Sequence, residues 1–416
     1  MNSTLKYPKL HCILSLLVSA IVPGLVAGAA VLEVFIFFSC LVFFFLNWKR
    51  LALDYYNTKF FIIFLIFYFF LILGSLLSEY VLNSIRNTLF YFRFGILILI
   101  IWYLLDHYKN FKYLFFCSIT VTILVLLFYT CLQLFILHNS VDDMRISGLF
   151  GTELIQGGFV LRLTPIFVIC YWYNKKYLNS NFDLFFYLIL ILNLILIILS
   201  GERATFFMTL LGLFMSLIFF KISLKKTIIF FLIFSSLCIL TITIYPKSKK
   251  RIFEETFSQV FSLSDTKEIK IKIFSEGHEQ HIKSAALMFS QNPFIGVGVR
   301  NFRLECKKEI YKNIGEYHCT THPHNTYLQF LSETGLIGFS FLLLFLIFLF
   351  TKICQLLKNI YIKNERVNVP LGVCFIIILI NFFPLTTTGS FFNNWLSTLY
   401  FIPAGFLFHE IYKKDY

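Results

Sequence analysis

The string THPHNTYLQFLSETGLIG, residues 321–338, places two histidines and an asparagine before a long apolar run. Because proline is favoured at the first helical position, a helix is predicted to start at about Pro323, after Thr321 or His322 as its cap. His324 would then lie in the first turn, beside backbone N–H groups that have no partner. Such a position favours the binding of a phosphate or of a developing negative charge.

The same predicted helix would place His324, Tyr327, Leu328 and Leu331 on one face. Gly335 is the predicted break between this helix and the span that follows. A polar helix start at the edge of a bilayer can meet a substrate whose lipid tail lies in the membrane and whose head group lies outside.

Arginine is the second kind of residue that could do chemistry, because its planar guanidinium binds phosphate oxygens. Arg203 lies in LSGERATFF, and Arg145 lies in RISGLFGTELIQGGFVLR among several glycines. In the alternative interpretation, Arg203 pairs with Glu202 or extends to the membrane surface. The ionisable residues in or beside predicted spans are Glu33, Arg93, Arg162, Glu202 and Arg203.

Five of the nine histidines lie between residues 278 and 324, at spacings that resemble those of metal ligands. Because no Asp, Glu or Cys completes a familiar pattern, we expect no metal and no other cofactor. Cys306 and Cys319 lie in the same stretch, and a disulfide between them is expected if the compartment is oxidising. The eight other cysteines fall in or beside apolar runs and are expected to act as small apolar residues.

Transmembrane helices must position these residues, because the 416-residue chain is 58% hydrophobic and only 14% charged. The expected fold class is an all-α polytopic membrane protein with about 12 spans of roughly 20 residues each. The expected spans are 10–28, 30–47, 60–78, 88–105, 113–137, 155–173, 184–200, 204–220, 227–245, 334–351, 369–386 and 394–409.

Lys and Arg gather in alternate connections between these spans, and this distribution predicts that both termini are cytoplasmic. The basic connections lie near residues 6–9, 49–59, 109–112, 175–176, 221–226, 352–366 and 413–414. The formal charge of +14 is therefore a topology signal, and no nucleic-acid partner is expected.

The predicted spans divide the chain into three parts. Residues 1–245 are expected to form helices 1–9, and residues 331–416 to form helices 10–12. Residues 246–330 would form one large loop outside the membrane. Within it we predict a helix at 277–291 that stops at Asn292-Pro293, followed by a glycine-rich turn.

His324-Asn325, nine residues and then Gly335-x-x-Gly338 resembles the signature of the O-antigen ligase and O-antigen polymerase superfamily. NPFIGVGVRNFR resembles the Pro-x-x-Gly-x-Gly-x-x-x-Phe segment of that family, and SGERA resembles its Ser-Gly-x-Arg turn. RISGLFGTELIQGGFV and TTTGSFFNNW look like further family segments. The resemblance runs from about residue 140 to the C-terminus.

The resemblance implies a metal-independent glycosyltransferase at the periplasmic face of the bacterial inner membrane. Such enzymes take a glycan from undecaprenyl pyrophosphate; ligases pass it to lipid A–core, and polymerases to the next lipid-linked repeat. His324 would be the catalytic residue and Arg203 would bind the donor pyrophosphate, with His322, Asn325, Gly335 and Gly338 in support. We expect a ligase-like member, with a polymerase as the alternative.

One departure concerns the second pyrophosphate-binding arginine, which many members have in an Arg-x-x-x-Trp pattern. Here that register reads His278-Glu279-Gln280-His281-Ile282. His278 could replace the arginine if it is protonated, and Arg145, Arg300 or Arg303 are the alternatives. A transporter of lipid-linked sugar would instead show two-fold repeats and broken helices, for which the sequence gives no sign.

Overall fold

The computed structural model describes residues 7–48, 52–137, 145–178, 180–263 and 269–413. The basic residues Lys6, Lys49, Arg50 and Lys414, which contributed to the predicted topology, lie outside the described residues. The bounds of the helices are α1 (Pro8–Ala27), α2 (Ala29–Trp48), α3 (Leu53–Tyr56), α4 (Lys59–Leu76), α5 (Val81–Thr88), α6 (Phe92–His107), α7 (Lys109–Leu132), α8 (Gln156–Asn174), α9 (Ser180–Leu199), α10 (Arg203–Phe220), α11 (Leu224–Ile244), α12 (Pro246–Lys249), α13 (Glu255–Val260), α14 (Glu276–Gln291), α15 (Phe302–Glu305), α16 (Glu309–Lys312), α17 (Thr326–Tyr361), α18 (Val369–Asn381) and α19 (Asn394–Tyr412).

The fold is the predicted all-α polytopic membrane fold. A helix occupies each of the twelve segments expected to span the membrane. Within the described ranges, nine helical segments are long and apolar enough to cross a bilayer, and α18 is a shorter apolar helix. The total number of spans therefore stays a prediction. A two-stranded antiparallel ribbon, β1 (Phe261–Leu263) and β2 (Ile269–Ile271), was not predicted.

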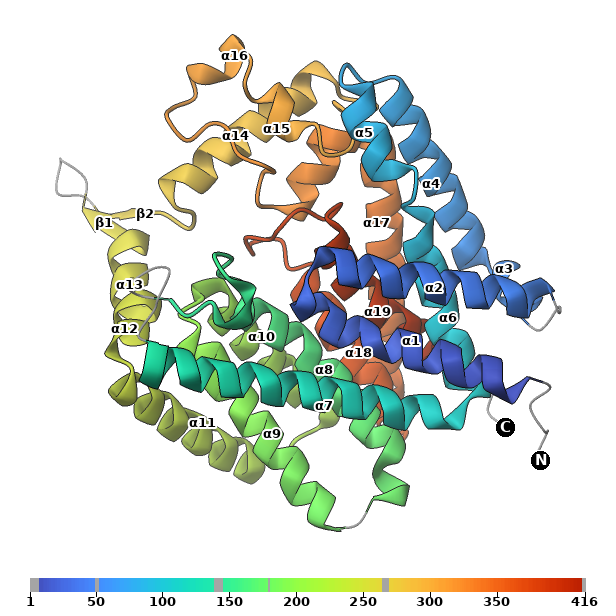
Figure 1. Cartoon of the computed structure of the whole chain (residues 1–416). Coiled ribbons are helices and arrows are strands. Elements are labelled where there is room, and N and C mark those ends of the chain that lie inside the picture. Colours follow the sequence, from blue (N-terminus) through green and yellow to red (C-terminus); the bar gives the residue numbers. More distant parts are fainter. Residues whose placement is uncertain (1–6, 49–51, 138–144, 179, 264–268, 414–416) are drawn as a thin grey trace.

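Helix α6 lies at the centre of the bundle because it is apolar on all sides. Residues 94–105 of α6 are buried, and α6 packs against α19 and α2. Helices α1 and α2 cross in front of it in Figure 1, and α7 starts at its lower end. Large apolar side chains also point outward from the bundle, among them Phe37, Phe45, Phe69 and Phe128. Exposed apolar surface of this extent fits a lipid-facing belt.

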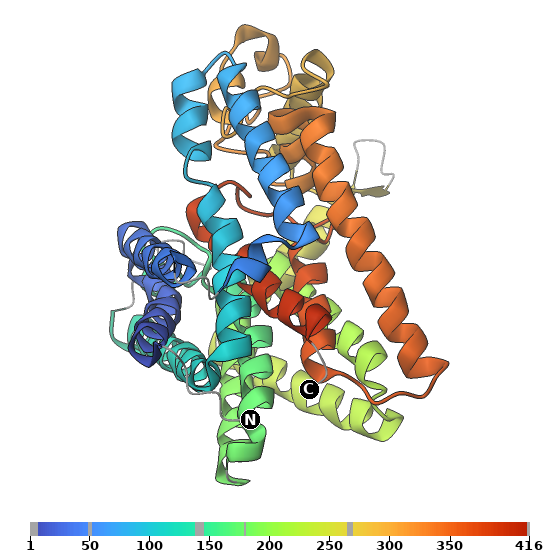
Figure 2. The same ribbon diagram turned by 90° about the vertical axis from the view of Figure 1, so that its right-hand side faces the viewer.

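Helices α14, α15 and α16 lie together at one end of the bundle, at the top of Figure 1. Helix α14 agrees with the helix predicted at 277–291, and it packs against α17. Figure 2 shows α17, in orange, running from this region diagonally down the side of the molecule. The end formed by α14–α17 therefore joins the loop region to the bundle.

Helix α17 contains the break that was predicted at Gly335, where φ is 63° and ψ is −168°. The residues around the break form backbone hydrogen bonds with the loop that follows α14. These bonds run from Val297 N to Ser332 O (2.9 Å), Gly298 N to Glu333 O (3.0 Å), Leu336 N to Pro293 O (2.8 Å) and Ile337 N to Phe294 O (3.2 Å). We call these two segments, 293–298 and 332–337, the interlock.

Glycine is required on both sides of the interlock, because the two backbones lie in contact. A Cβ atom on Gly335 would lie 2.3 Å from the carbonyl carbon and oxygen of Phe294. A Cβ atom on Gly296, where φ is 69°, would lie 2.4 Å from the carbonyl carbon of Glu333. The glycines of NPFIGVG and SETGLIG thus let the loop after α14 contact α17 directly.

Candidate active site

Four histidines from two separate segments meet at the start of α17, and we call them the histidine cluster. His278 and His281 lie on α14, and His322 and His324 lie in the loop before α17. The ring centroid of His324 lies 4.1 Å from that of His322, 5.2 Å from that of His278 and 5.3 Å from that of His281. His324 is thus the member that contacts all of the others.

The helix before Gly335 begins later than predicted. It starts at Thr326, so His324 lies ahead of the first turn and does not share a helical face with Tyr327 and Leu328. The predicted start at Pro323 was wrong because Asn325 is the cap. Its side-chain oxygen accepts hydrogen bonds from the backbone N–H groups of Tyr327 (3.0 Å) and Leu328 (3.1 Å). Those two N–H groups therefore have a partner within the protein.

His324 has a backbone conformation that is uncommon for a residue with a side chain, with φ at 54°. Its carbonyl accepts a hydrogen bond of 2.9 Å from Thr388 N, and His322 Nε2 lies 3.1 Å from the carbonyl oxygen of Thr388. The side chain of Asn325 donates to Pro384 O at 2.8 Å. The segment at 384–391 thus stabilises the strained turn, as functional sites often require.

A buried glutamine fixes the same segment from the α17 side. Gln329 Nε2 donates to Ser390 Oγ at 2.8 Å, and its Oε1 accepts from Phe391 N at 2.8 Å. Sequence reasoning noted TTTGSFFNNW as a segment but gave it no role, and it missed Gln329. The available signal was the run of polar residues in TYLQFLSET, directly before an apolar span, since buried polar side chains require partners.

The surroundings of the cluster lower the pKa values of its histidines and favour the neutral form of His281, His322 and His324. Burial, together with repulsion from the three other imidazoles, lowers the pKa of His324 to about 3. Burial also lowers the pKa values of His281 and His322 to about 4. The pKa of His278 is lowered by burial and by the Arg203 guanidinium. These surroundings disfavour a protonated His278, although it can still form hydrogen bonds to a substrate.

Arg203 and Glu202 are neighbours in sequence with different surroundings. The carboxylate of Glu202 accepts hydrogen bonds from Gly157 N (2.6 Å), Gly158 N (3.1 Å) and Thr205 Oγ1 (2.9 Å), so it caps the start of α8. Among the described residues there is no ion pair between Glu202 and Arg203. The structural alternative in which these two residues pair is therefore wrong.

The Arg203 side chain instead points toward α13, where its guanidinium donates to Gln259 Oε1 at 2.8 Å. It lies within electrostatic reach of Arg145, Arg251, Glu255 and His278, and Arg251 is itself paired with Glu255. Arg145 itself donates to Leu154 O at 2.7 Å. The structure thus brings Arg203 and Arg145 to the same side of the site, and Arg203 is the cation that acts on His278.

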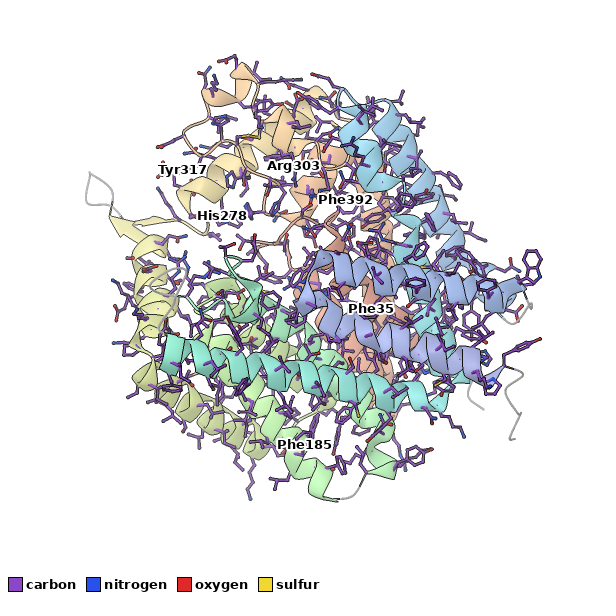
Figure 3. All side chains as sticks on the ribbon, in the orientation of Figure 1. Phe35, Phe185, His278, Arg303, Tyr317 and Phe392 are labelled. Carbon is purple, nitrogen blue, oxygen red and sulfur yellow. A yellow bond between two sulfur atoms is a disulfide. The ribbon has the colours of Figure 1, made fainter. Side chains whose placement is uncertain are left out.

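A second pair of arginines lies on α15 and just before it. Arg300 donates to Asn87 Oδ1 at 2.7 Å, and its carbonyl accepts from Asn83 Nδ2 at 3.1 Å. These bonds connect the loop to α5. Arg303 lies on α15, close enough to His322 to lower the pKa of that imidazole, after the larger effect of burial. Figure 3 labels both Arg303 and His278.

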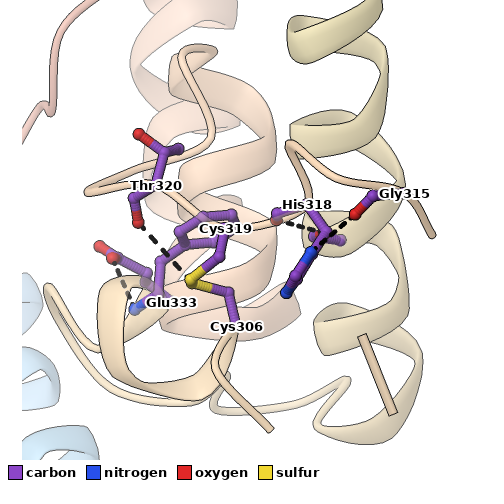
Figure 4. Close-up of a disulfide and its surroundings, with 8 residues drawn as sticks. Cys306, Gly315, His318, Cys319, Thr320 and Glu333 are labelled. Atoms are coloured by element: carbon purple, nitrogen blue, oxygen red, sulfur yellow. Dashed lines mark hydrogen bonds between the residues drawn. A yellow bond between two sulfur atoms is a disulfide. The ribbon is translucent and has the colours of Figure 1, made fainter. Parts of the chain in front are cut away.

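Cys306 and Cys319 form a disulfide that closes the loop around α16, and their Cα atoms are 5.1 Å apart. Figure 4 shows this disulfide near His318, whose Nδ1 lies 2.7 Å from Gly315 O. His318 is the loop histidine that lies outside the cluster. No group of three or more His, Cys, Asp or Glu side chains in the described part of the chain could hold a metal ion.

An apolar cavity of about 340 Å³ lies beneath the site, between α4, α17, α18 and α19. Phe330, one turn into α17, and Phe391, at the end of the 384–391 segment, both belong to its wall. The rest of the wall is largely aromatic as well. The cavity and the histidine cluster therefore share two of the segments that form them.

Residues 188–343 match the family model described as O-antigen ligase. The matched stretch contains Arg203, the histidine cluster and the interlock, whereas Arg145 and the 384–391 segment lie outside it. No curated protein matches the chain in sequence.

Proposed function

We propose that this chain transfers a glycan from undecaprenyl pyrophosphate to an acceptor sugar, lipid A–core in the ligase form of the reaction. The match of residues 188–343 to the family model described as O-antigen ligase supports this proposal. The observation that carries the proposal is the position of His324. A neutral imidazole lies between three other histidines in a constrained turn, and Arg203 lies on the His278 side of the cluster.

His324 is the proposed catalytic base. Its neutral ring accepts the proton of the acceptor hydroxyl as the oxygen attacks the anomeric carbon of the glycan. The bond from that carbon to the diphosphate breaks, and the electron pair leaves with the undecaprenyl diphosphate. A bound pyrophosphate would also raise the pKa of the nearby imidazoles, which makes proton acceptance by His324 more favourable in the loaded enzyme.

Arg203 is the proposed ligand of the donor pyrophosphate, with Arg145 beside it. Departure of the diphosphate develops negative charge, which a guanidinium in a fixed position stabilises. His278 lies between this charge and His324 and can donate a hydrogen bond to a phosphate oxygen. In this proposal cationic side chains stabilise the negative charge of the leaving diphosphate, as a divalent ion does in other transferases. The proposed reaction therefore requires no metal.

The proposed location is the bacterial inner membrane, with both termini cytoplasmic and the site at the periplasmic face. The large segment at 246–330 would then be periplasmic, where the Cys306–Cys319 disulfide is stable. The aromatic cavity beneath the cluster offers an apolar surface to the lipid part of a substrate. Two of the intramembrane charges that a transporter could use are instead paired with each other, since Arg93 and Glu33 lie 3.0 Å apart.

The experiment that tests the function is a gel of lipopolysaccharide and of lipid-linked glycan from a strain that lacks the gene. A ligase predicts long glycan on undecaprenyl pyrophosphate together with bare lipid A–core. A polymerase predicts lipid A–core that carries a single repeat and no ladder. Unchanged pools of both kinds would contradict a role in transfer to lipid A–core.

A further inference from the structure

The histidine cluster lies between positive charges on two sides. Arg203 is the charged group that lowers the pKa of His278, whereas Arg303 and Arg300 are the cations that lower the pKa of His322. His324 contacts both of these histidines. The base is therefore flanked by one cationic group on the α10 side and by another on the α15 side.

The two arginines on the α15 side differ in what they contact. The guanidinium of Arg300 binds Asn87, which leaves it a structural role between α15 and α5. The Nε atoms of both arginines are buried without a partner. Within the part of the chain that the structure describes, the guanidinium of Arg303 has no hydrogen-bond or ion-pair partner at its other nitrogens either, whereas Arg300 has Asn87. A buried guanidinium nitrogen without a partner is costly, and this cost is recovered when an anion binds.

Other charged side chains near α15 do have partners of opposite charge. Lys308 pairs with Glu79 at 2.6 Å and with Glu305 at 2.8 Å. The carboxylate of Glu305 also accepts a hydrogen bond from Tyr311. The acidic side chains around α15 are thus already bound to residues other than Arg303.

We propose that Arg303 binds an anionic group of the glycan acceptor, either a phosphate or a sugar carboxylate. This inference rests on the proposed function and extends it to the chemical class of the acceptor. Arginine suits both groups, because its fork of N–H donors binds two oxygens at once.

The position of Arg303 relative to the histidine cluster indicates that it binds the acceptor and not the donor. In a direct displacement at an anomeric carbon, the entering oxygen and the leaving group lie on opposite faces of the sugar ring. Arg203 is the proposed ligand of the leaving diphosphate and lies on the His278 side. The acceptor hydroxyl must reach His324 from the other face, and Arg303 lies beside His322 on that side.

The test measures transfer by the full-length purified protein in nanodiscs. The donor is the lipid-linked glycan that accumulates in the strain lacking the gene, and the acceptor is lipid A–core from the same strain. The variants are Arg303→Ala, Arg303→Lys and the control Lys307→Ala, an exposed cation on the same segment. We expect Arg303→Ala to raise KM for the acceptor by about tenfold or more, with kcat and the donor KM within about threefold of wild type.

Chemically treated acceptors identify the anion. Treatment with hydrogen fluoride removes phosphates, and carbodiimide followed by borohydride reduces carboxylates. One treatment should raise the wild-type KM by about tenfold and have no further effect on Arg303→Ala. This arm uses wild-type protein, so it tests the inference even if Arg303→Ala does not fold.

Three results would overturn the inference. They are an unchanged acceptor KM for Arg303→Ala, a rise confined to the donor KM, and equal use of treated and untreated acceptors by the wild type. A failure of the proposed function would look different, because wild-type protein would then transfer no glycan to any acceptor.

Discussion

The two sides of the candidate active site are stabilised to different degrees. On the histidine side, the interlock joins the loop after α14 to α17, and the 384–391 segment binds both His324 and Asn325. On the Arg203 side, the guanidinium reaches α13 through Gln259, and α13 leads into the short β1–β2 ribbon. The first side is connected by many backbone bonds, and the second depends on side chains.

This difference matches the two tasks that transfer requires. A base must lie at a fixed distance from the hydroxyl it deprotonates, because small displacements reduce the rate strongly. A ligand of a pyrophosphate on a long lipid can adjust while the substrate enters, and regions with few connections open more easily. We infer that the histidine side is preorganised and that the Arg203 side adapts to the donor.

The largest effect is expected from a Cβ atom in the interlock. Gly335→Ala would place a methyl group 2.3 Å from the Phe294 backbone at a φ of 63°, so we expect a loss of several kcal/mol and little folded protein. Gly151→Ala is the matched control, because Gly151 has a φ of 62° and open space around it. Thermal unfolding in detergent should show a loss of about 1–3 kcal/mol for the control, from backbone strain alone. Equal stability of both variants would refute the role of the interlock.

Removal of the cation on the other side should leave folding intact and reduce transfer. For Arg203→Ala we expect the transfer rate to fall by about 10²- to 10³-fold, which is typical for loss of one group that stabilises a leaving anion. The control is Arg366→Ala, an exposed arginine in the connection between α17 and α18. The measurement is the transfer rate at equal protein levels in membranes. A rate for Arg203→Ala within threefold of wild type would contradict the assignment.

The histidine side should also lose stability at acid pH. His281, His322 and His324 have folded-state pKa values of about 4, 4 and 3, below the usual value of roughly 6.5. The unfolded chain therefore binds more protons, so stability is complete above about pH 6.5 and falls as the pH drops toward 4.

Thermal unfolding between pH 7.5 and pH 4 measures this loss. We expect the unfolding temperature of the wild type to fall by roughly 5 °C or more over this range. The double variant His281→Gln/His322→Gln should fall less, and His318→Gln should follow the wild type. Parallel curves for all three proteins would show that the cluster does not titrate in this way.

The smallest effect is expected for the contact that joins Arg203 to α13. Gln259→Ala removes the amide that accepts from the Arg203 guanidinium. If the donor pyrophosphate replaces Gln259 as the partner of the Arg203 guanidinium, kcat/KM for the donor should stay within about threefold of wild type. A loss of about a hundredfold would mean that this side is as strictly positioned as the histidine side.

Much of the fold could be predicted from local patterns. The apolar runs located a helix in every expected span, and the helix at 277–291 and the break at Gly335 were correct, because length, proline and glycine act locally. The start of α17 was misplaced because Asn325 is a better cap than Thr321 or His322 for this turn. Proline at 323 lies ahead of the helix.

The partners of the site could not be predicted in the same way. Thr388 binds the His324 carbonyl across 64 residues, and Glu202 caps α8 from the start of α10, more than 40 residues later. Such contacts leave no periodic signal in the sequence, because they depend on how the helices pack. The structure also distinguishes two arginines that the sequence left equivalent. Arg300 donates to Asn87, whereas Arg303 has no partner among the described residues.

The central claim is that a neutral His324 carries out proton transfer in a glycan transferase. The direct test is the transfer of accumulated lipid-linked glycan to lipid A–core by purified wild type, His324→Ala and His318→Ala at matched thermal stability. We predict a loss of about 10³-fold or more for His324→Ala and near wild-type rates for His318→Ala. Robust transfer by a folded His324→Ala variant would contradict the account.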